Sequence, residues 1–169
     1  MDRPVSANDD LFTHVVQVLA PNPYALYSPE AQNLLLILAG HPPRELVDFA
    51  ASLGWTSVYF IAAEWDYVPG RTDLGRGDLV LSNKPVADSI QYGRDAAHEA
   101  REVLVVELKH LTQDTGPNQC GTRRKARRMV EKQVGDSVAA WKRAFPKDMV
   151  RDGVFCVFEG AKCTVAPPP

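Results

Sequence analysis

The stretch Val103-Leu104-Val105-Val106-Glu107-Leu108-Lys109-His110-Leu111 places a carboxylate and an amine two residues apart within an apolar run. A β-strand turns successive side chains to opposite faces, so Glu107 and Lys109 are expected on one face of a strand. A charge beside a packed core is costly unless it is paired, hydrogen-bonded or metal-bound. These two charges therefore require partners from elsewhere in the chain.

Length and composition set the class of protein. The 169 residues, 45% hydrophobic and 24% charged, predict one globular domain with a single core. The longest wholly apolar run, residues 34–39, is too short to cross a bilayer, so no membrane segment is expected. Residues 1–10 are polar and partly acidic, unlike a secretory or transit signal, which predicts an intracellular protein, cytoplasmic or nuclear. The three cysteines form no CxxC pair and are expected to be reduced.

Hydrophobic periodicity predicts helices first, then three consecutive strands, a long helix and a fourth strand. The expected helices cover about residues 11–19, 29–39, 43–53 and 122–145, and the expected strands about residues 55–64, 75–81, 102–111 and 154–158. We expect residues 1–43 to form a helical extension packed on a core of residues 44–163, with residues 164–169 as a disordered tail.

This order of elements resembles the PD-(D/E)XK nuclease superfamily over roughly residues 44–160. The core of that superfamily is α-β-β-β-α-β, with an acid on the second core strand and (D/E)-x-K on the third. Asp78 and Glu107-Leu108-Lys109 match these positions. The segment Gly75-Arg76-Gly77-Asp78, together with Gln133 on the following helix, is most similar to the RecB-like branch. The resemblance implies a restriction-endonuclease-like α/β fold, in which helices flank a mixed sheet.

The residue types suit hydrolysis of a phosphodiester. Mg²⁺ or Mn²⁺ prefers oxygen ligands, and Asp78 and Glu107 on adjacent strands are the expected carboxylate ligands. The resemblance implies that the carbonyl of Leu108 adds a ligand and that Gln133 contacts a metal-bound water or the substrate backbone. Lys109 is the expected catalytic lysine, which would orient or deprotonate the attacking water.

A further acid is also implied by the resemblance, because one often comes from the first core helix. Glu45 is the first candidate by position and Glu30 the second. The better explanation of either residue is a first-turn glutamate that complements a helix dipole. Glu64 and Asp66 are alternative acids if the first strand ends beside the site.

A basic run follows the third strand, on an otherwise mildly acidic chain of net charge −2. We expect it to hold the nucleic-acid backbone without reading sequence, with DNA favoured over RNA. A solvated helix face and a nuclear localisation signal are alternatives. The run contains Arg123, Arg124, Lys125, Arg127 and Arg128.

Three readings follow from these residues. The favoured one is a metal-dependent nuclease, because Asp78, Glu107 and Lys109 are all present. The second is a nuclease-fold protein without activity that acts as a nucleic-acid-binding or assembly module. The third treats Glu107 and Lys109 as a structural pair in an unrelated α/β protein. A structure that separates Asp78 from Glu107 would remove the first two. The sequence leaves the oligomeric state open, a homodimer included.

Overall fold

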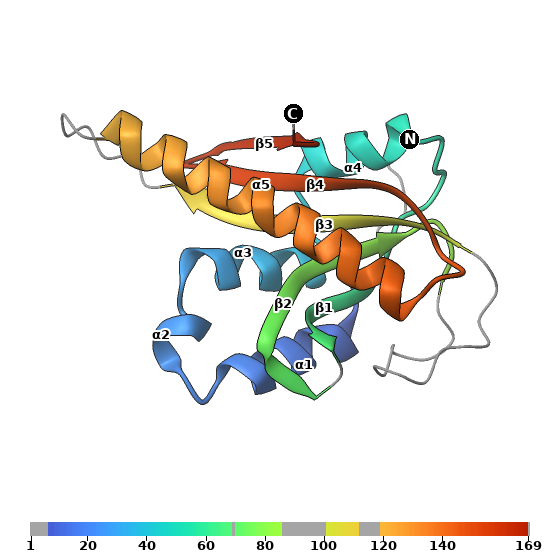
Figure 1. Cartoon of the computed structure of the whole chain (residues 1–169), viewed down its shortest axis with the longest axis horizontal. Coiled ribbons are helices and arrows are strands. Elements are labelled where there is room, and N and C mark those ends of the chain that lie inside the picture. The colour runs from blue at the N-terminus through green and yellow to red at the C-terminus, as the bar shows by residue number, and fades with distance from the viewer. Residues whose placement is uncertain (1–6, 69, 86–100, 112–118, 169) are drawn as a thin grey trace.

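The chain folds as a five-stranded sheet with helices on both faces (Figure 1). The computed structural model describes residues 7–68, 70–85, 101–111 and 119–168, and the side chains of residues 119–124, 126 and 127 lie outside that description. The helices are α1 (Asp9–Leu19), α2 (Pro23–Leu26), α3 (Pro29–Leu38), α4 (Arg44–Ser52) and α5 (Gln119–Ala144). The strands are β1 (Tyr59–Val68), β2 (Arg71–Ser82), β3 (Glu102–Leu111), β4 (Met149–Glu159) and β5 (Lys162–Ala166).

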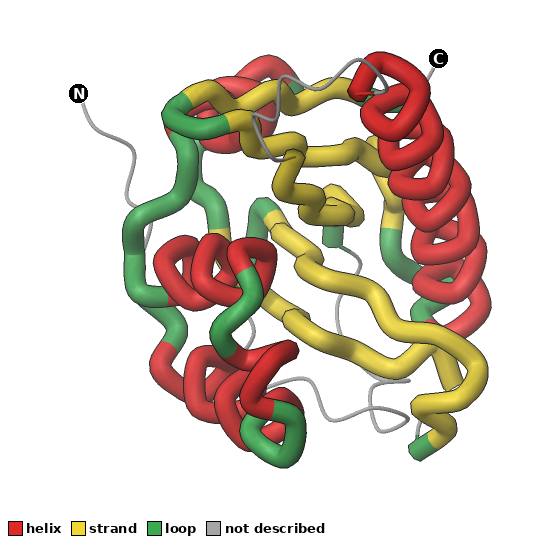
Figure 2. The backbone as a smooth tube through the Cα atoms, turned by 90° about the vertical axis from the view of Figure 1, so that its left-hand side faces the viewer, coloured by secondary structure: helices red, strands yellow, loops and turns green. Residues whose placement is uncertain are grey.

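The sheet is mixed, and its strands lie side by side in chain order. β1, β2 and β3 pair antiparallel, β3 and β4 pair parallel, and β5 returns antiparallel along β4. The parallel pair needs a crossover, and α5 supplies it by lying across one face of the sheet (Figures 1 and 2). The predicted α/β class, a mixed sheet flanked by helices, is confirmed.

β3 shows why one strand carries so many apolar residues. Leu104, Val106 and Leu108 belong to a core cluster that also contains α1, α3 and α4. Val103 and Val105 face the other way, into a second cluster around α5. A strand covered by helices on both faces has no solvated side, so its apolar residues run on without alternation.

The predicted long helix is confirmed as α5, which continues through Gly135. A Cβ atom at that position would meet nothing within 4 Å, so the glycine does not mark a close approach. Among the described residues, no helix is long and apolar enough to cross a membrane.

The β1–β2 hairpin is longer than predicted. Residues 66–73 were expected to form a turn, but they continue both strands as far as Val68 and Arg71. Their polar side chains pair locally, as in the bond that Arg76 Nε donates to Asp66 Oδ1 at 3.2 Å. Because this end of the hairpin is stabilised by polar contacts, hydrophobic periodicity did not indicate it.

The end of the chain also differs from the prediction. Residues 164–166 were assigned to a disordered tail, but they belong to β5 and pair with residues 155–157 of β4. Cys163 and Val165 of β5 pack against the core cluster that includes the buried residues of α4. This apolar contact explains why the short strand β5 forms. Two other differences are the short helix α2, which was not predicted, and the start of β4 at Met149, earlier than the predicted residue 154. The connections at residues 86–100 and 112–118 lie outside the described residues.

Candidate active site

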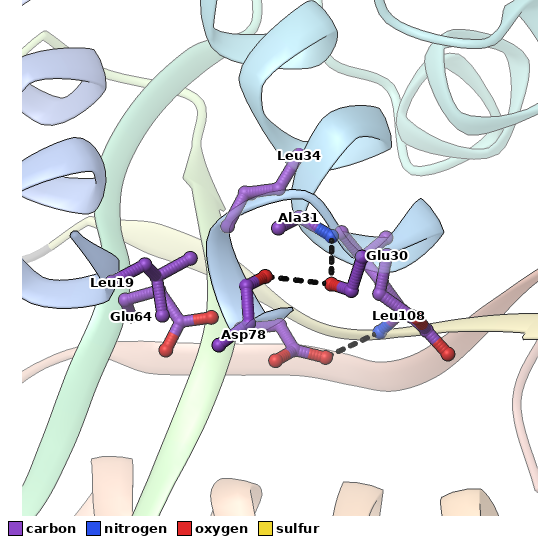
Figure 3. Close-up of a pocket in the computed structure, with 9 residues that line it drawn as sticks. Leu19, Glu30, Ala31, Leu34, Glu64, Asp78 and Leu108 are labelled. Atoms are coloured by element: carbon purple, nitrogen blue, oxygen red, sulfur yellow. Dashed lines mark hydrogen bonds between the residues drawn. The ribbon is translucent and has the colours of Figure 1, made fainter. Parts of the chain in front are cut away.

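Asp78 lies where β2 leaves β3. The last paired residues of these strands are Leu79 and Val106, so Leu108 has no main-chain partner on β2. The carboxylate of Asp78 takes that place: its Oδ2 accepts a hydrogen bond from the Leu108 amide at 2.7 Å (Figure 3). The N–H and C=O of a strand residue point to the same edge, so the Leu108 carbonyl also faces this opening.

A pocket of about 150 Å³ begins at this opening, between the sheet and the α2–α3 junction. Three carboxylates, from Glu30, Glu64 and Asp78, line it. Glu64 sits across from Asp78, between the register pairs Ala63–Leu79 and Trp65–Gly77. Its backbone is in the left-handed region, with φ 45°, and His14 Nε2 donates to its carbonyl at 3.3 Å. A non-glycine residue in that region is strained, and such strain often accompanies a functional site.

Glu107 lies on the α5 side of β3 and is only 3% exposed. Ser137 of α5 donates a short hydrogen bond to Glu107 Oε1. The oxygens of Tyr67 and Ser137 are 2.7 Å apart. The one hydroxyl proton of Ser137 is used on Glu107, so Tyr67 is the donor in that second bond. Side chains from β1 and α5 thus fix the orientation of Glu107.

Asp78 and Glu107 act on each other directly. Burial raises the pKa of Glu107 well above its ordinary value, and the charge of Asp78 and a hydrogen bond with it raise that pKa further. Burial also raises the pKa of Asp78, against the opposing effect of hydrogen bonds from Glu107 and the Leu108 amide. Glu107 is therefore the partner that holds a proton first. The two carboxyl groups therefore lie near enough to influence each other's ionisation.

Glu64 extends this acidic cluster. Burial and the charge of Asp78 raise the pKa of Glu64 to about 7, although Arg76 acts in the opposite direction. Arg76 Nη1 lies 3.8 Å from Glu64 Oε2. The same guanidinium also binds Asp66, so its charge is divided between two acids.

Lys109 is the second cation near the acids. Its Nζ lies 3.9 Å from Glu30 Oε1, and each of these side chains is 36% exposed. The charges of Lys109 and Glu30 both act on the pKa of Asp78. Glu107 and Lys109 were expected on one face, but Glu107 bonds to α5 whereas the ammonium of Lys109 lies beside α3. The ammonium therefore lies beside Glu30, one of the acids that line the pocket.

Two residues predicted from the family resemblance lie elsewhere. Glu45 is exposed on α4, and its charge acts on Cys156 and Cys163, whose Sγ atoms are 3.3 Å apart. Glu30 takes the position expected for Glu45, because α3 rather than α4 borders the pocket. Gln133 is exposed on α5. Ser137, one turn later, is the α5 residue that contacts Glu107, whereas Gln133 was expected to contact a metal-bound water or the substrate backbone.

The sequence did give one signal for Ser137. It lies within the apolar stripe of α5, between Val134 and Trp141, where a buried hydroxyl requires a hydrogen-bond partner. No comparable signal existed for Tyr67, because its position depends on the unpredicted length of β1.

The basic run lies on the first half of α5. Lys125 and Arg128 are exposed there, and the side chains of Arg123, Arg124 and Arg127 lie outside the described residues. The N-terminal end of α5 and the short helix α2 are at the same end of the molecule, on opposite sides of the sheet (Figures 1 and 2). Exposed cations and the acidic pocket are thus found at one end.

Among residues 7–68, 70–85, 101–111 and 119–168, no three His, Cys, Asp or Glu side chains converge as a ready-made set of metal ligands. Comparison with protein-family models, with curated proteins and with solved structures finds no match.

Proposed function

We propose that the protein is a metal-dependent nuclease with a restriction-endonuclease-like core, and that it hydrolyses phosphodiester bonds of nucleic acid, DNA in preference to RNA. One observation carries the proposal: Asp78 and Glu107 meet at the point where β2 and β3 separate. Lys109 lies beside Glu30, which lines the adjoining pocket. An acid on one strand and an acid and a lysine on the next are the side chains that this reaction requires.

The donor set suits Mg²⁺ or Mn²⁺. Asp78 and Glu107, with the carbonyl of Leu108, are the groups that would hold the ion, and Glu64 and Glu30 are close enough to the pocket to support it through water. Mg²⁺ is commonly held by only one or two carboxylates, with waters and substrate phosphate as its other ligands, so a third converging acid is not required. Because burial and Asp78 raise the pKa of Glu107, the ion would have to displace a proton from this carboxyl group, and its charge would then favour the ionised form. When bound, the ion would neutralise phosphate charge and lower the pKa of the attacking water.

The protein's own groups have separate roles in this proposal. The side chain of Asp78 takes the place of a β2 main-chain partner for the Leu108 amide, so the two strands are not paired at the pocket. A phosphate group could approach at this opening. Lys109 supplies a positive charge that orients the attacking water and stabilises the charge that develops on the phosphoryl oxygens. Glu30 holds the ammonium at the pocket, and Ser137 holds Glu107.

Two measurements test the proposal, one of which does not need activity. Addition of Mg²⁺ or Mn²⁺ should raise the melting temperature of the wild type. At an ion concentration 100 times the dissociation constant, binding stabilises the folded state by roughly 2.7 kcal/mol. The shift should be lost in Asp78→Asn and Glu107→Gln and kept in Asp73→Asn, an exposed acid on the same β2 strand.

The second measurement is cleavage of single-stranded, duplex and branched DNA, and of RNA, with each ion and with EDTA. Lys109→Ala should reduce the rate by at least about 100-fold, the scale of a positioned acid–base or charge-stabilising group. Lys162→Ala, at an exposed lysine on β5, is the matched control. Cleavage that persists in EDTA, or that is equal in Lys109→Ala, would contradict the mechanism.

The second candidate is a nucleic-acid-binding module that has this fold without activity. This candidate is supported by the contacts that Glu107 already makes with Ser137 and Asp78, because these contacts occupy the carboxyl group in the absence of a metal ion. DNA binding in Mn²⁺ with no cleavage of any substrate would favour this candidate.

A further inference from the structure

The short helix α2 presents two exposed tyrosines. Tyr24 is 91% exposed and Tyr27 is 73% exposed, which makes them the two most exposed large hydrophobic side chains of the described residues. Single exposed apolar residues are ordinary, but two aromatic rings on one short turn, Tyr24 within α2 and Tyr27 at its C-cap, form a concentrated aromatic surface.

This surface is held firmly in place. Asn22 caps α2 by accepting a hydrogen bond from the Tyr24 amide at 3.2 Å. At the other end, Gln32 Nε2 donates to the Leu26 carbonyl at 3.0 Å, and Ser28 Oγ donates to the Ala25 carbonyl at 2.8 Å. The rings are therefore carried on an anchored turn, and their presentation costs little additional ordering on binding.

The same turn forms one wall of the acidic pocket. Ala25 and Ser28 line the pocket together with Asp78 and Glu64 (Figure 3). Tyr24 and Tyr27 each directly precede one of these lining residues in the chain, so the exposed tyrosines belong to the same turn that borders the pocket. A nucleotide whose phosphate reached Asp78 would bring its neighbouring bases to this helix.

The pocket itself offers little to hold a nucleic acid. Its described lining consists of carboxylates, aliphatic side chains and one serine, and the carboxylates repel phosphate in the absence of a cation. Affinity must then come from groups around it. Lys125 and Arg128 on α5 lie at the same end of the molecule and suit the phosphate backbone, and the tyrosine rings suit the faces of bases (Figures 1 and 2).

We infer that Tyr24 and Tyr27 form a base-stacking platform, and that the substrate is single-stranded nucleic acid or an unpaired end. This inference rests on the proposed nuclease function. Bases within a duplex have both faces covered by their neighbours, so only unpaired nucleotides can stack on the rings.

The test is binding of fluorescent oligonucleotides in EDTA, where no cleavage occurs. The ligands are an oligothymidine, an abasic strand of the same length and a blunt duplex. The double variant Tyr24→Ala/Tyr27→Ala should bind the oligothymidine at least about fivefold more weakly, and up to about 150-fold for each base that loses its stack. Its affinity for the abasic strand should be unchanged.

Two variants serve as controls. Tyr24→Phe/Tyr27→Phe keeps both rings and should bind the oligothymidine as the wild type does. Leu36→Ala removes an exposed apolar side chain from α3 and should also have no effect. Equal affinity of the wild type and the alanine double variant for oligothymidine would overturn the inference, and so would an equal loss on the abasic strand.

Failure of the stacking platform and failure of the nuclease proposal give different experimental results. Cleavage by the wild type in Mn²⁺, with oligothymidine binding unaffected by the alanine substitutions, would leave the nuclease proposal standing and overturn the stacking platform. Ring-dependent binding of oligothymidine without any cleavage would support the platform and contradict the nuclease proposal.

Discussion

Glu64 is the residue whose ionisation has the most direct consequence for stability. Its folded pKa of about 7 lies above the ordinary value of 4.5, so its ionised form is disfavoured by folding. The stabilising state is the protonated one: it is fully present below about pH 4.5 and is lost as the pH rises through 7. Because the side chain is only 16% exposed, the loss reaches up to roughly 3 kcal/mol.

We therefore expect Glu64→Gln to stabilise the metal-free protein at pH 8 and to have little effect at pH 4. The glutamine cannot ionise, so the difference in unfolding free energy between variant and wild type should grow between these two values. Urea denaturation in EDTA across this range would measure it. Asp73→Asn, at an exposed acid, should show no such growth, and parallel curves for wild type and Glu64→Gln would contradict the prediction.

Ser137 holds the carboxyl group of Glu107, which we propose as a cation ligand. Its hydrogen bond lowers the pKa of Glu107 against the larger effects of burial and Asp78. Ser137→Ala should therefore make Glu107 harder to ionise and leave Tyr67 without its partner, at a cost of about 1–3 kcal/mol in stability.

The informative readout for Ser137→Ala is the Mn²⁺ concentration needed to raise the melting temperature, measured at several pH values. The variant should need a higher pH than the wild type for the same response. Tyr67→Phe keeps the bond from Ser137 to Glu107, so its pH dependence should shift less. A loss of stability with an unchanged pH dependence would make Ser137 purely structural.

At the scale of elements, the β1–β2 hairpin depends on Gly77. A Cβ atom there would lie 2.2 Å from Trp65 Cε2. Trp65 is buried and packs edge-on against Trp141, with 5.2 Å between the ring centroids, so it has little room to move. Gly77→Ala should cost about 1–3 kcal/mol or more through overpacking, and it should displace the adjacent Asp78.

Gly135 on α5 provides the matched control. A Cβ atom there meets nothing within 4 Å, and alanine favours a helix more than glycine does. Gly135→Ala should stabilise the protein by roughly 0.5–1 kcal/mol. Thermal unfolding of both variants would show opposite shifts, and a stabilised Gly77→Ala protein would contradict the packing account.

The elements also show what sequence can and cannot predict. α5 was predictable because its apolar periodicity specifies a helix and the face that it buries, and β3 because a continuous apolar run rich in β-branched residues is typical of a strand buried on both faces. The approach of Asp78 to Glu107 followed from the order of the strands. Tyr67 and Glu30 were harder to place, since their positions depend on the length of the hairpin and on which helix covers the end of the sheet.

At the scale of the whole molecule, charge is divided between two sides of one end. The net charge is −2, yet the pocket gathers acids on one side of the sheet and α5 carries exposed cations on the other. Under the proposed function, nucleic acid would be held through the cations of α5, because the acids make the pocket unfavourable to phosphate until a cation is present. Divalent ions should thus improve binding as well as cleavage.

This division predicts the salt dependence of binding. If Lys125 and Arg128 each neutralise one phosphate, then Lys125→Ala and Arg128→Ala should each reduce the slope of log affinity against log salt by about 0.7 for a single strand. Titration of an abasic strand at several salt concentrations in EDTA would isolate this backbone term from base stacking. Lys162→Ala on β5 should leave the slope unchanged. An equal effect from all three substitutions would show that binding follows overall charge and is not directed to α5.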